Sequence, residues 1–277
     1  MATTRHALLI FSKVPEPGLV KTRLSNLKDG WYKPEVASWL YHCMFFDVVE
    51  TCCVALKALE SAYEGLSYDL VVSTTPADHE PLMRNLFASS GEWPREIRFI
   101  HDEGASFDEH YNDAFAKVWD MGAESILSLG ADMPALTKDD VIRGFEQLHR
   151  LHDEGSRGIV LAPDQELGVS IVGWNRETEF DHTGIYYNRS GLTVLPAYVR
   201  KAKSAGIPVR YLPPVPDVDT MMDLFHNATL VEAQCYAAES TGDPAPWRTA
   251  EAMAELKLFD FKIAPNDLHD PRESIDK

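Results

Sequence analysis

The sequence has little of what marks a secreted, metal-finger or membrane protein. Its 277 residues include only four cysteines and no C-x-x-C pair, so neither a disulfide framework nor a structural zinc site is expected. No run approaches the roughly 20 apolar residues that cross a membrane, and the short apolar run at 7–11 does not make a signal peptide. The sequence therefore predicts a cytoplasmic protein with reduced thiols and no membrane partner.

Positive charge is also scarce, because Lys and Arg number 26 against 43 Asp and Glu, for a net charge of −17. Phosphate backbones need a basic surface, so a nucleic-acid partner is not expected. Hydrophobic residues at 45% and charged residues at 25% are ordinary for a globular protein and exclude a disordered chain. The basic residues are concentrated at 1–33, which hold six of them and only two acidic ones, and this favours an anionic ligand.

Strand-like apolar runs alternate with helix-length segments. Apolar residues recur at three and four positions between 34 and 59, which predicts a helix, whereas 7–11 is continuously apolar, as in a strand buried on both faces. The expected strands are 7–11, 68–73, 97–101, 125–129, 158–162, 169–174 and 209–212. The expected helices are 34–59, 81–88, 107–121, 139–149, 192–205 and 219–236. This alternation predicts an α/β fold with a doubly wound, mostly parallel sheet.

The last part of the chain has a different composition. Residues 239–277 contain four prolines and many charges, with one short helix expected at 249–258. We therefore predict a domain at 1–238 and an extension at 239–277, which packs on the domain or lies at a subunit contact such as that of a homodimer.

A cationic loop follows the first expected strand. In SKVPEPGLVKTRL, at 12–24, Lys13, Lys21 and Arg23 supply three cations, and Gly18 lets the backbone turn. Such groups suit a diphosphate or triphosphate through charge-assisted hydrogen bonds. The loop is not a Walker P-loop, since G-x-x-x-x-G-K-[ST] is absent. A solvated surface loop is the alternative interpretation.

An acidic loop, GADMPALT at 130–137, ends an apolar strand in mid-chain. Ligands of open α/β sheets bind at the carboxyl ends of the strands, so the carboxylate of Asp132 is placed to bind Mg²⁺ or Mn²⁺. The alternative is that Asp132 caps the next helix, but Thr137 makes the better cap, with Asp140 three residues later.

A second acidic loop, DVDTMMDL at 217–224, precedes the last expected helix of the domain. Alternation puts Asp217 and Asp219 on one face, where two close carboxylates attract a divalent cation. The alternative is a helix cap at Asp219 or Thr220, with Asp223 in the first turn.

These motifs resemble a bacterial and archaeal family known as glycosyltransferase A-like. LLIFSKVPEPGLVKTRL, at 8–24, is similar to its opening strand followed by Phe-x-Lys/Arg-x-Pro-x-x-Gly-x-x-Lys-Thr-Arg-Leu. GADMPALT resembles its Gly-x-Asp-x-Pro-x-Leu, and DVDTMMDL its Asp-x-Asp-Thr-x-x-Asp-Leu. FDEHYNDAF, at 107–115, is less closely similar to Leu-Gly-Glu-Arg-x-x-x-Ala-Phe.

The family is part of the nucleotide-diphospho-sugar transferase superfamily and is similar to phospholactate and molybdenum-cofactor guanylyltransferases. The resemblance implies a three-layer α/β/α sandwich, a nucleotide at the first loop, and a divalent metal at Asp132 and Asp219, with Asp217 as a substitute. It implies that Lys21 and Arg23, with Lys13, contact phosphates. The expected nucleotide site also includes Phe11, Ser12, Gly18 and Thr74, the last from a strand end that would face the base or ribose.

One segment departs from the family pattern. Where members have Pro-x-x-Asp-Gly-Gly-Tyr-x-Leu-x-Gly, residues 163–173 read PDQELGVSIVG. Gly168 keeps the second glycine, Glu166 takes the Asp position, and Leu167 replaces the first glycine. We assign Glu166 and Gly168 to the acceptor, and expect Leu167 to narrow this loop.

Three functions are compatible with these residues. The first is metal-dependent nucleotidyl transfer from a nucleoside triphosphate to a small phosphorylated or hydroxyl acceptor, with Lys21, Arg23 and Asp132 as catalytic residues. The second is glycosyl transfer from a nucleotide sugar. The position two residues after Asp132 is Pro134, however, so this loop has no Asp-x-Asp motif. The third is an inactive nucleotide-binding member, which only the altered segment 163–173 supports.

Overall fold

A single mixed sheet organises the protein. The computed structural model describes residues 4–186 and 188–260, and within them seven strands pair in the order β3-β2-β1-β4-β6-β5-β7. The strands are β1 (Thr4–Phe11), β2 (Leu66–Thr74), β3 (Ile97–His101), β4 (Ser125–Gly130), β5 (Ile159–Pro163), β6 (Val169–Asn175) and β7 (Val209–Tyr211). β6 runs antiparallel to β4 and β5, and the other neighbouring pairs are parallel. The mostly parallel sheet is confirmed.

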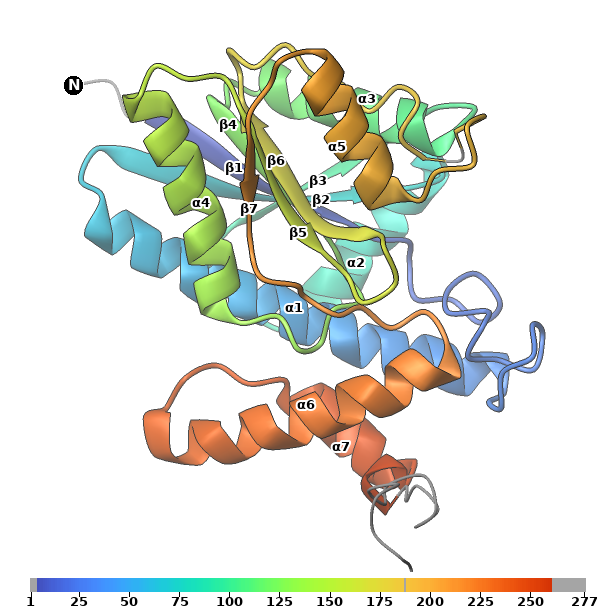
Figure 1. The fold of residues 1–277 in the computed structure, drawn as a ribbon. Coiled ribbons are helices and arrows are strands. Elements are labelled where there is room, and N and C mark those ends of the chain that lie inside the picture. Colours follow the sequence, from blue (N-terminus) through green and yellow to red (C-terminus); the bar gives the residue numbers. More distant parts are fainter. Residues whose placement is uncertain (1–3, 187, 261–277) are drawn as a thin grey trace, which may run out of the picture.

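Helices cover both faces of the sheet. The helices α1 (Pro34–Ala62), α2 (Glu80–Ser89) and α4 (Lys138–Asp153) lie on one face, and α3 (Phe107–Asp120) and α5 (Val194–Ser204) on the other (Figure 1). Side chains of β1 alternate between the layers: Leu8 and Ile10 pack toward α1, Ala7 and Leu9 toward α3. Because both faces of β1 are buried against apolar residues, its sequence has to be continuously apolar, as it is at 7–11. The three-layer α/β/α sandwich is confirmed.

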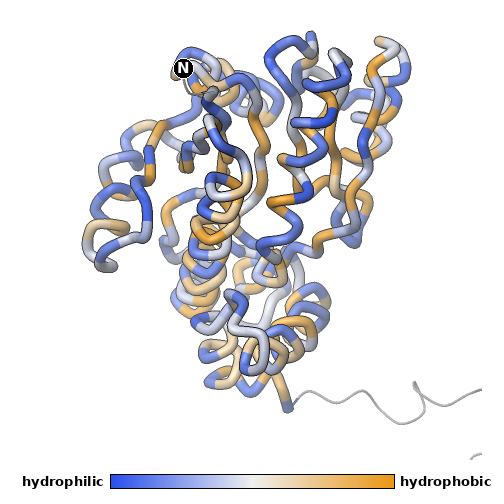
Figure 2. The backbone as a smooth tube through the Cα atoms, turned by 90° about the vertical axis from the view of Figure 1, so that its left-hand side faces the viewer, coloured by the Kyte–Doolittle hydropathy of each residue, from blue (hydrophilic) through white to orange (hydrophobic). Residues whose placement is uncertain are grey.

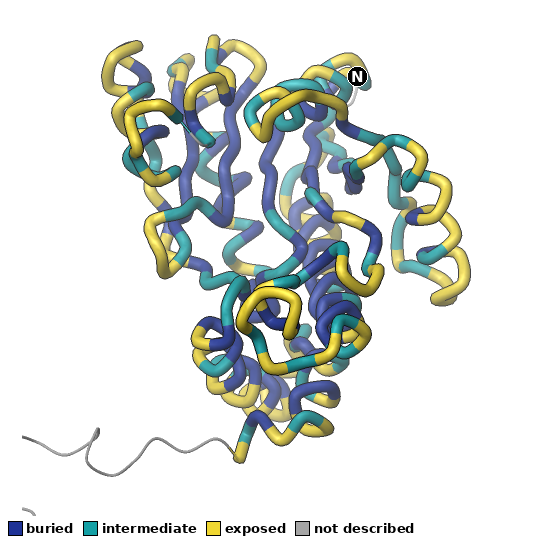
Figure 3. The backbone as a smooth tube through the Cα atoms, turned by 90° about the vertical axis from the view of Figure 1, so that its right-hand side faces the viewer, coloured by how far each residue is buried: buried dark blue, intermediate teal, exposed yellow. Residues whose placement is uncertain are grey.

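Hydropathy and burial follow this layering. Hydrophobic and hydrophilic residues alternate along the outer helices (Figure 2). The central strands and much of α1 are buried, whereas β3, β7 and most of the connecting loops are partly or fully exposed (Figure 3). Among the described residues, no helix is both long and apolar enough to cross a membrane.

The helix α6 (Met221–Thr241) crosses the boundary expected after residue 238 and ends at Gly242, whose φ of 70° closes the helix. The next helix, α7 (Trp247–Glu255), packs against α1 and α6. Residues 261–277 of the expected extension lie outside the described residues. The division of the chain into a domain and an extension stays a prediction.

A buried carboxylate attaches α7 to α1. Asp47, only 3% exposed, accepts hydrogen bonds from the backbone N–H of Thr249 at 2.7 Å and from Arg248, at its backbone N–H and its guanidinium. Arg248 also pairs with the half-exposed Glu50. Because backbone donors at the start of α7 have no partners within that helix, Asp47 serves as a cap supplied by another helix.

We expect Asp47→Ala to destabilise the fold by about 3 kcal/mol, since it leaves Arg248 and the first N–H groups of α7 without their buried acceptor. Urea unfolding measures this free energy. Glu50→Ala is the matched control and should cost well under half as much, because its ion pair is half-exposed. Equal costs would contradict the anchoring role of Asp47.

A buried histidine lies in the layer between the sheet and α5. His182 is fully buried, and its Nδ1 is 2.7 Å from the hydroxyl of Tyr198. Burial lowers the pKa of His182 to about 3, with a smaller contribution from the charge of Lys201. The folded chain therefore keeps this ring neutral at pH values where the unfolded chain protonates it.

We predict that this histidine makes the fold acid-sensitive. Its contribution is complete above the ordinary pKa of 6.5 and declines as the pH falls, by about 2 kcal/mol near pH 5. His182→Gln keeps a polar partner for Tyr198 but does not titrate in this range, so unfolding free energies between neutral pH and about pH 5 should fall less steeply. If the unfolding free energies of the wild-type protein and of His182→Gln fell equally with pH, His182 would not be the source of the acid sensitivity.

Candidate active-site cleft

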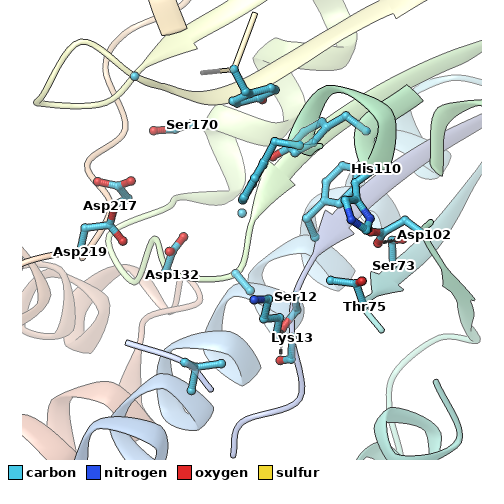
Figure 4. Close-up of a pocket in the computed structure, with 18 of the residues that line it drawn as sticks. Ser12, Lys13, Ser73, Thr75, Asp102, His110, Asp132, Ser170, Asp217 and Asp219 are labelled. Carbon is cyan, nitrogen blue, oxygen red and sulfur yellow. Dashed lines mark hydrogen bonds and ion pairs between the residues drawn. The ribbon is translucent and has the colours of Figure 1, made fainter. Parts of the chain in front are cut away.

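A cavity of about 710 Å³ opens where the carboxyl ends of β1 to β4 meet. Loops that follow these four strands contribute Ser12, Thr75, Asp102 and Asp132 to its wall. In Figure 4 three labelled carboxylates lie at one end, Ser73 and His110 lie at the other, and Ser12 and Lys13 lie between them. The cleft is where the strand-end rule for α/β sheets places a ligand.

Most of the residues proposed from the sequence meet in this cleft. Those that line it are Phe11, Ser12, Lys13, Lys21, Asp132, Gly168, Asp217 and Asp219. Four others do not line it: Gly18, Arg23, Thr74 and Glu166. Thr74 is buried behind its lining neighbours Ser73 and Thr75, because successive side chains of a strand point to opposite sides.

Lys21 joins the two acidic loops. Its Nζ donates to Oδ2 of Asp132 at 2.5 Å and to Oδ1 of Asp219 at 3.0 Å, and the Lys21 side chain is 7% exposed. Burial alone would lower the pKa of Lys21, but the two carboxylates outweigh burial and raise that pKa above its usual value. The charge of Lys21 in turn holds the pKa of Asp219 below its usual range. Exposed Arg23 reaches the second oxygen of Asp219 at 3.3 Å.

Local structure explains why Lys21 reaches both loops. Its own φ is +46°, a left-handed conformation that is unfavourable for a residue with a side chain. Three residues earlier, Gly18 adopts φ +81° without that cost, as expected for the turn. The acidic loops are themselves tied together by a hydrogen bond from the N–H of Val218 to the carbonyl of Asp132, at 3.0 Å.

Neither acidic loop uses its proposed metal ligand as a helix cap. Thr137 is the N-cap of α4 and forms a capping box with Asp140, while Thr220 does the same at α6 with Asp223. These caps satisfy the first N–H groups of the helices, so Asp132 and Asp219 are available for the cleft. Asp219 donates only its backbone N–H to Asp223.

Asp217 is the third carboxylate at this end. Gln165 holds it by donating from Nε2 to its Oδ1 at 2.9 Å and by accepting from its backbone N–H. Burial, then the charges of Asp132 and Asp219, raise the pKa of Asp217 to about 7. This end of the cleft therefore carries more negative charge than Lys21 balances.

The donor set fits a cation. Two carboxylate oxygens already converge on one positive group, the ammonium of Lys21, and a third carboxylate lies close enough to be perturbed by both. Within residues 4–186 and 188–260, however, no three His, Cys, Asp or Glu side chains are grouped closely enough to hold a metal ion. Lys21 lies between the carboxylates that a divalent ion would use, so the two cations compete for the same oxygens.

The segment expected to contact the acceptor is organised by Asp164. Its Oδ1 accepts from the N–H groups of Glu166, at 2.6 Å, and Gly168, at 2.8 Å. A Cβ at Gly168 would lie 1.8 Å from Oδ2 of Asp164, so a larger residue there would have to displace that side chain. Leu167 takes φ +70° with an exposed side chain and does not line the cleft, so it does not narrow it as expected. Glu166 is exposed and lies outside the lining.

A polar group that no sequence motif indicated lies at the opposite end of the cleft. Ser73 donates from Oγ to Asp102 at 2.6 Å, and Nδ1 of His110 lies 2.7 Å from the other oxygen of Asp102. Asp102 follows β3 as Asp132 follows β4, so the strand-end rule would have found it. His110 comes from within α3, and no sequence pattern indicates its partner.

Aromatic rings form part of the cleft wall. Phe11 stacks on Tyr111 with ring centroids 4.0 Å apart, and Tyr111 lies 4.7 Å from Tyr186. These three residues line the cleft. Burial raises the pKa of Tyr111 and Tyr186 well above the usual value, so both stay protonated hydroxyls.

We predict that Lys21→Met increases the affinity for Mn²⁺ about tenfold or more, because it removes the competing ammonium from Asp132 and Asp219. Paramagnetic titration of Mn²⁺ measures this directly. Lys13→Met is the matched control, since Lys13 lines the same cleft without an ion pair to any described residue. Unchanged or weaker Mn²⁺ binding in Lys21→Met would contradict the competition.

Comparisons with known proteins agree with this architecture. Residues 58–189 match the family model described as "Uncharacterized protein conserved in bacteria (DUF2064)". No curated protein matches the sequence. Among solved structures, a protein of Desulfovibrio desulfuricans G20 assigned to the nucleotide-diphospho-sugar transferases is 23% identical, with a TM-score of 0.71, over 94% of this chain and 99% of that one.

Two more distant structures are also similar. CMP:2-keto-3-deoxy-manno-octonic acid synthetase, complexed with CTP, is 13% identical over 83% of this chain and 99% of that one, with a TM-score of 0.49. A cytidylyltransferase from Leptospira borgpetersenii serovar Hardjo-bovis is 13% identical over 95% and 99%, with a TM-score of 0.48. The resemblance drawn from the sequence motifs is confirmed at the level of the fold: this chain has the fold of the nucleotide-diphospho-sugar transferases.

Proposed function

We propose that this chain is a nucleotide-using transferase that moves a nucleotidyl group from a nucleoside triphosphate to a small phosphorylated or hydroxyl acceptor. The observation that carries this proposal is the meeting of the first-loop cations with the carboxylates of Asp132 and Asp219 in one cleft. A triphosphate needs positive charge, and so does the pyrophosphate that leaves. The fold alone would not decide the function.

In this proposal Lys13 and Lys21 both bind phosphate, but they differ in their partners within the chain. Lys13 is exposed in the cleft and makes no ion pair with any described residue, so its charge is available to an incoming anion. Lys21 is held by two carboxylates, and a divalent ion bound to these carboxylates would free its ammonium to contact the phosphates. Arg23 does not line the cleft, and its one ion pair among the described residues is with Asp219, so a cation bound at Asp219 would free it in the same way.

Asp132 and Asp219, with Asp217 as a substitute ligand, would hold a divalent ion, whose chemistry is to polarise a phosphate oxygen and offset charge on the leaving group. Asp217 lies beside Gln165, which links it to the loop of Asp164. That loop and Ser170 form the wall on the side of β6, where the acceptor would approach.

Glycosyl transfer from a nucleotide sugar is the second candidate. The Asp-x-Asp pair of Asp217 and Asp219 lines the cleft, where it is placed to contact a diphosphate through a metal. Loss of the unpaired Lys13 should matter less here, because the leaving nucleoside diphosphate carries less charge than a triphosphate substrate.

An assay of leaving groups separates the candidates. Each nucleoside triphosphate, with Mg²⁺ and a panel of small phosphorylated and hydroxylated acceptors, should release pyrophosphate if nucleotidyl transfer is correct. Release of nucleoside diphosphate from nucleotide sugars would instead establish glycosyl transfer. Nucleotide binding in calorimetry with neither product would identify an inactive member and contradict both.

We expect Asp132→Asn to lower turnover by about 10²–10³-fold, in line with the loss of one electrostatic contact in an active site. Asp139→Asn, at the exposed start of α4, is the control and should retain full activity. Retention of metal-dependent activity in Asp132→Asn would show that the site is elsewhere.

A further inference from the structure

The end of the cleft away from the carboxylate cluster contains a buried, fully partnered carboxylate. Asp102 is 3% exposed and accepts from Ser73 Oγ through Oδ2 at 2.6 Å. Its Oδ1 lies 2.7 Å from Nδ1 of His110. A carboxylate only accepts hydrogen bonds, so Nδ1 of His110 is the donor in this pair.

In the neutral form of the His110 ring, this pairing fixes which nitrogen carries the proton. With the proton on Nδ1, the neutral ring carries a lone pair on Nε2 and can only accept there. The His110 side chain is 28% exposed, lines the cleft, and has Nδ1–Asp102 as its only hydrogen bond among the described residues. Figure 4 shows the ring beside Asp102, Ser73 and Thr75.

The loop that precedes α3 is tied to the helix that carries His110. Asp113 accepts from the N–H of Glu103 at 2.9 Å, and Glu109 accepts from the N–H of Ala105 at 2.7 Å. Gly104 packs so closely that a Cβ would lie 2.7 Å from the backbone nitrogen of His110. The acceptor on Nε2 is therefore preorganised rather than ordered by the ligand.

The position of His110 Nε2 relative to the expected phosphate site indicates which part of a nucleotide this nitrogen would contact. Asp132, Asp217 and Asp219 lie at the other end of the cleft, and Lys13 lies between the two ends (Figure 4). Phe11 and Tyr111, which stack on each other, add aromatic surface to the lining of the same cleft. A nucleotide whose phosphates bind at Lys13 and whose base points away from these carboxylates would bring the edge of that base toward His110.

We propose that His110, positioned by Asp102, is a specificity-determining residue that accepts a hydrogen bond from an exocyclic amino group of the nucleobase. A base with a carbonyl in that position brings its lone pair against that of Nε2 and leaves both unpaired. The site then prefers an amino base to its keto counterpart, cytosine to uracil or adenine to hypoxanthine. This inference rests on the proposed use of a nucleotide.

Calorimetric binding of CTP against UTP, and of ATP against ITP, to the full chain tests the proposal. In one of the two pairs the amino nucleotide should bind about tenfold tighter or more. His110→Leu should bring that ratio close to one, and His110→Gln, which keeps a polar group of mixed character, should reduce it. His101→Leu is the matched control, because His101 pairs with Glu80 outside the cleft lining, and it should keep the ratio.

The outcomes separate this inference from the function on which it rests. If no nucleoside triphosphate binds, nucleotide use is wrong and the inference is overturned with it. If nucleotides bind but neither pair shows a preference, or if the preference persists in both His110 variants, the role of His110 alone is overturned. A uniform loss of affinity for both members of a pair would show a merely structural role and would also overturn it.

Discussion

The ammonium of Lys21 between Asp132 and Asp219 is the interaction on which the cleft depends. It connects the loop after β1 to loops that lie more than a hundred residues later in the chain, and it is nearly buried. Without a cation there, three carboxylates would face one another in a partly desolvated site, which the raised pKa of Asp217 already reflects. A cation is therefore part of this architecture, whether it is the ammonium or an ion that displaces it.

The sheet supplies the geometry that makes this possible. Parallel strands end at one edge, so the residues after β1, β2, β3 and β4 meet although they are distant in sequence. The antiparallel β6 then brings its first residues, with Ser170, to the same edge. The cleft consequently has a carboxylate end and a Ser73–Asp102–His110 end, with the cationic loop between them.

Much of this fold and cleft could be predicted from the spacing of apolar residues and from the polar residues that follow the strands. Every expected strand and helix is present within a few residues, because apolar runs and helical spacing report burial directly. Asp132 and Asp219 were found because acidic side chains follow or precede recognisable elements. The bridge from Lys21 was not predictable, since it depends on a left-handed backbone at a non-glycine residue. Nor was the pairing of Asp102 with His110, which depends on how α3 packs beside β3.

A crystal structure with a non-hydrolysable nucleoside triphosphate and Mn²⁺ tests the central claim most directly. The account predicts phosphates in contact with Lys13 and Lys21, and the Lys21 ammonium withdrawn from at least one of Asp132 and Asp219. A nucleotide bound outside this cleft, or bound with the Lys21 bridge intact and its phosphates away from both lysines, would contradict it.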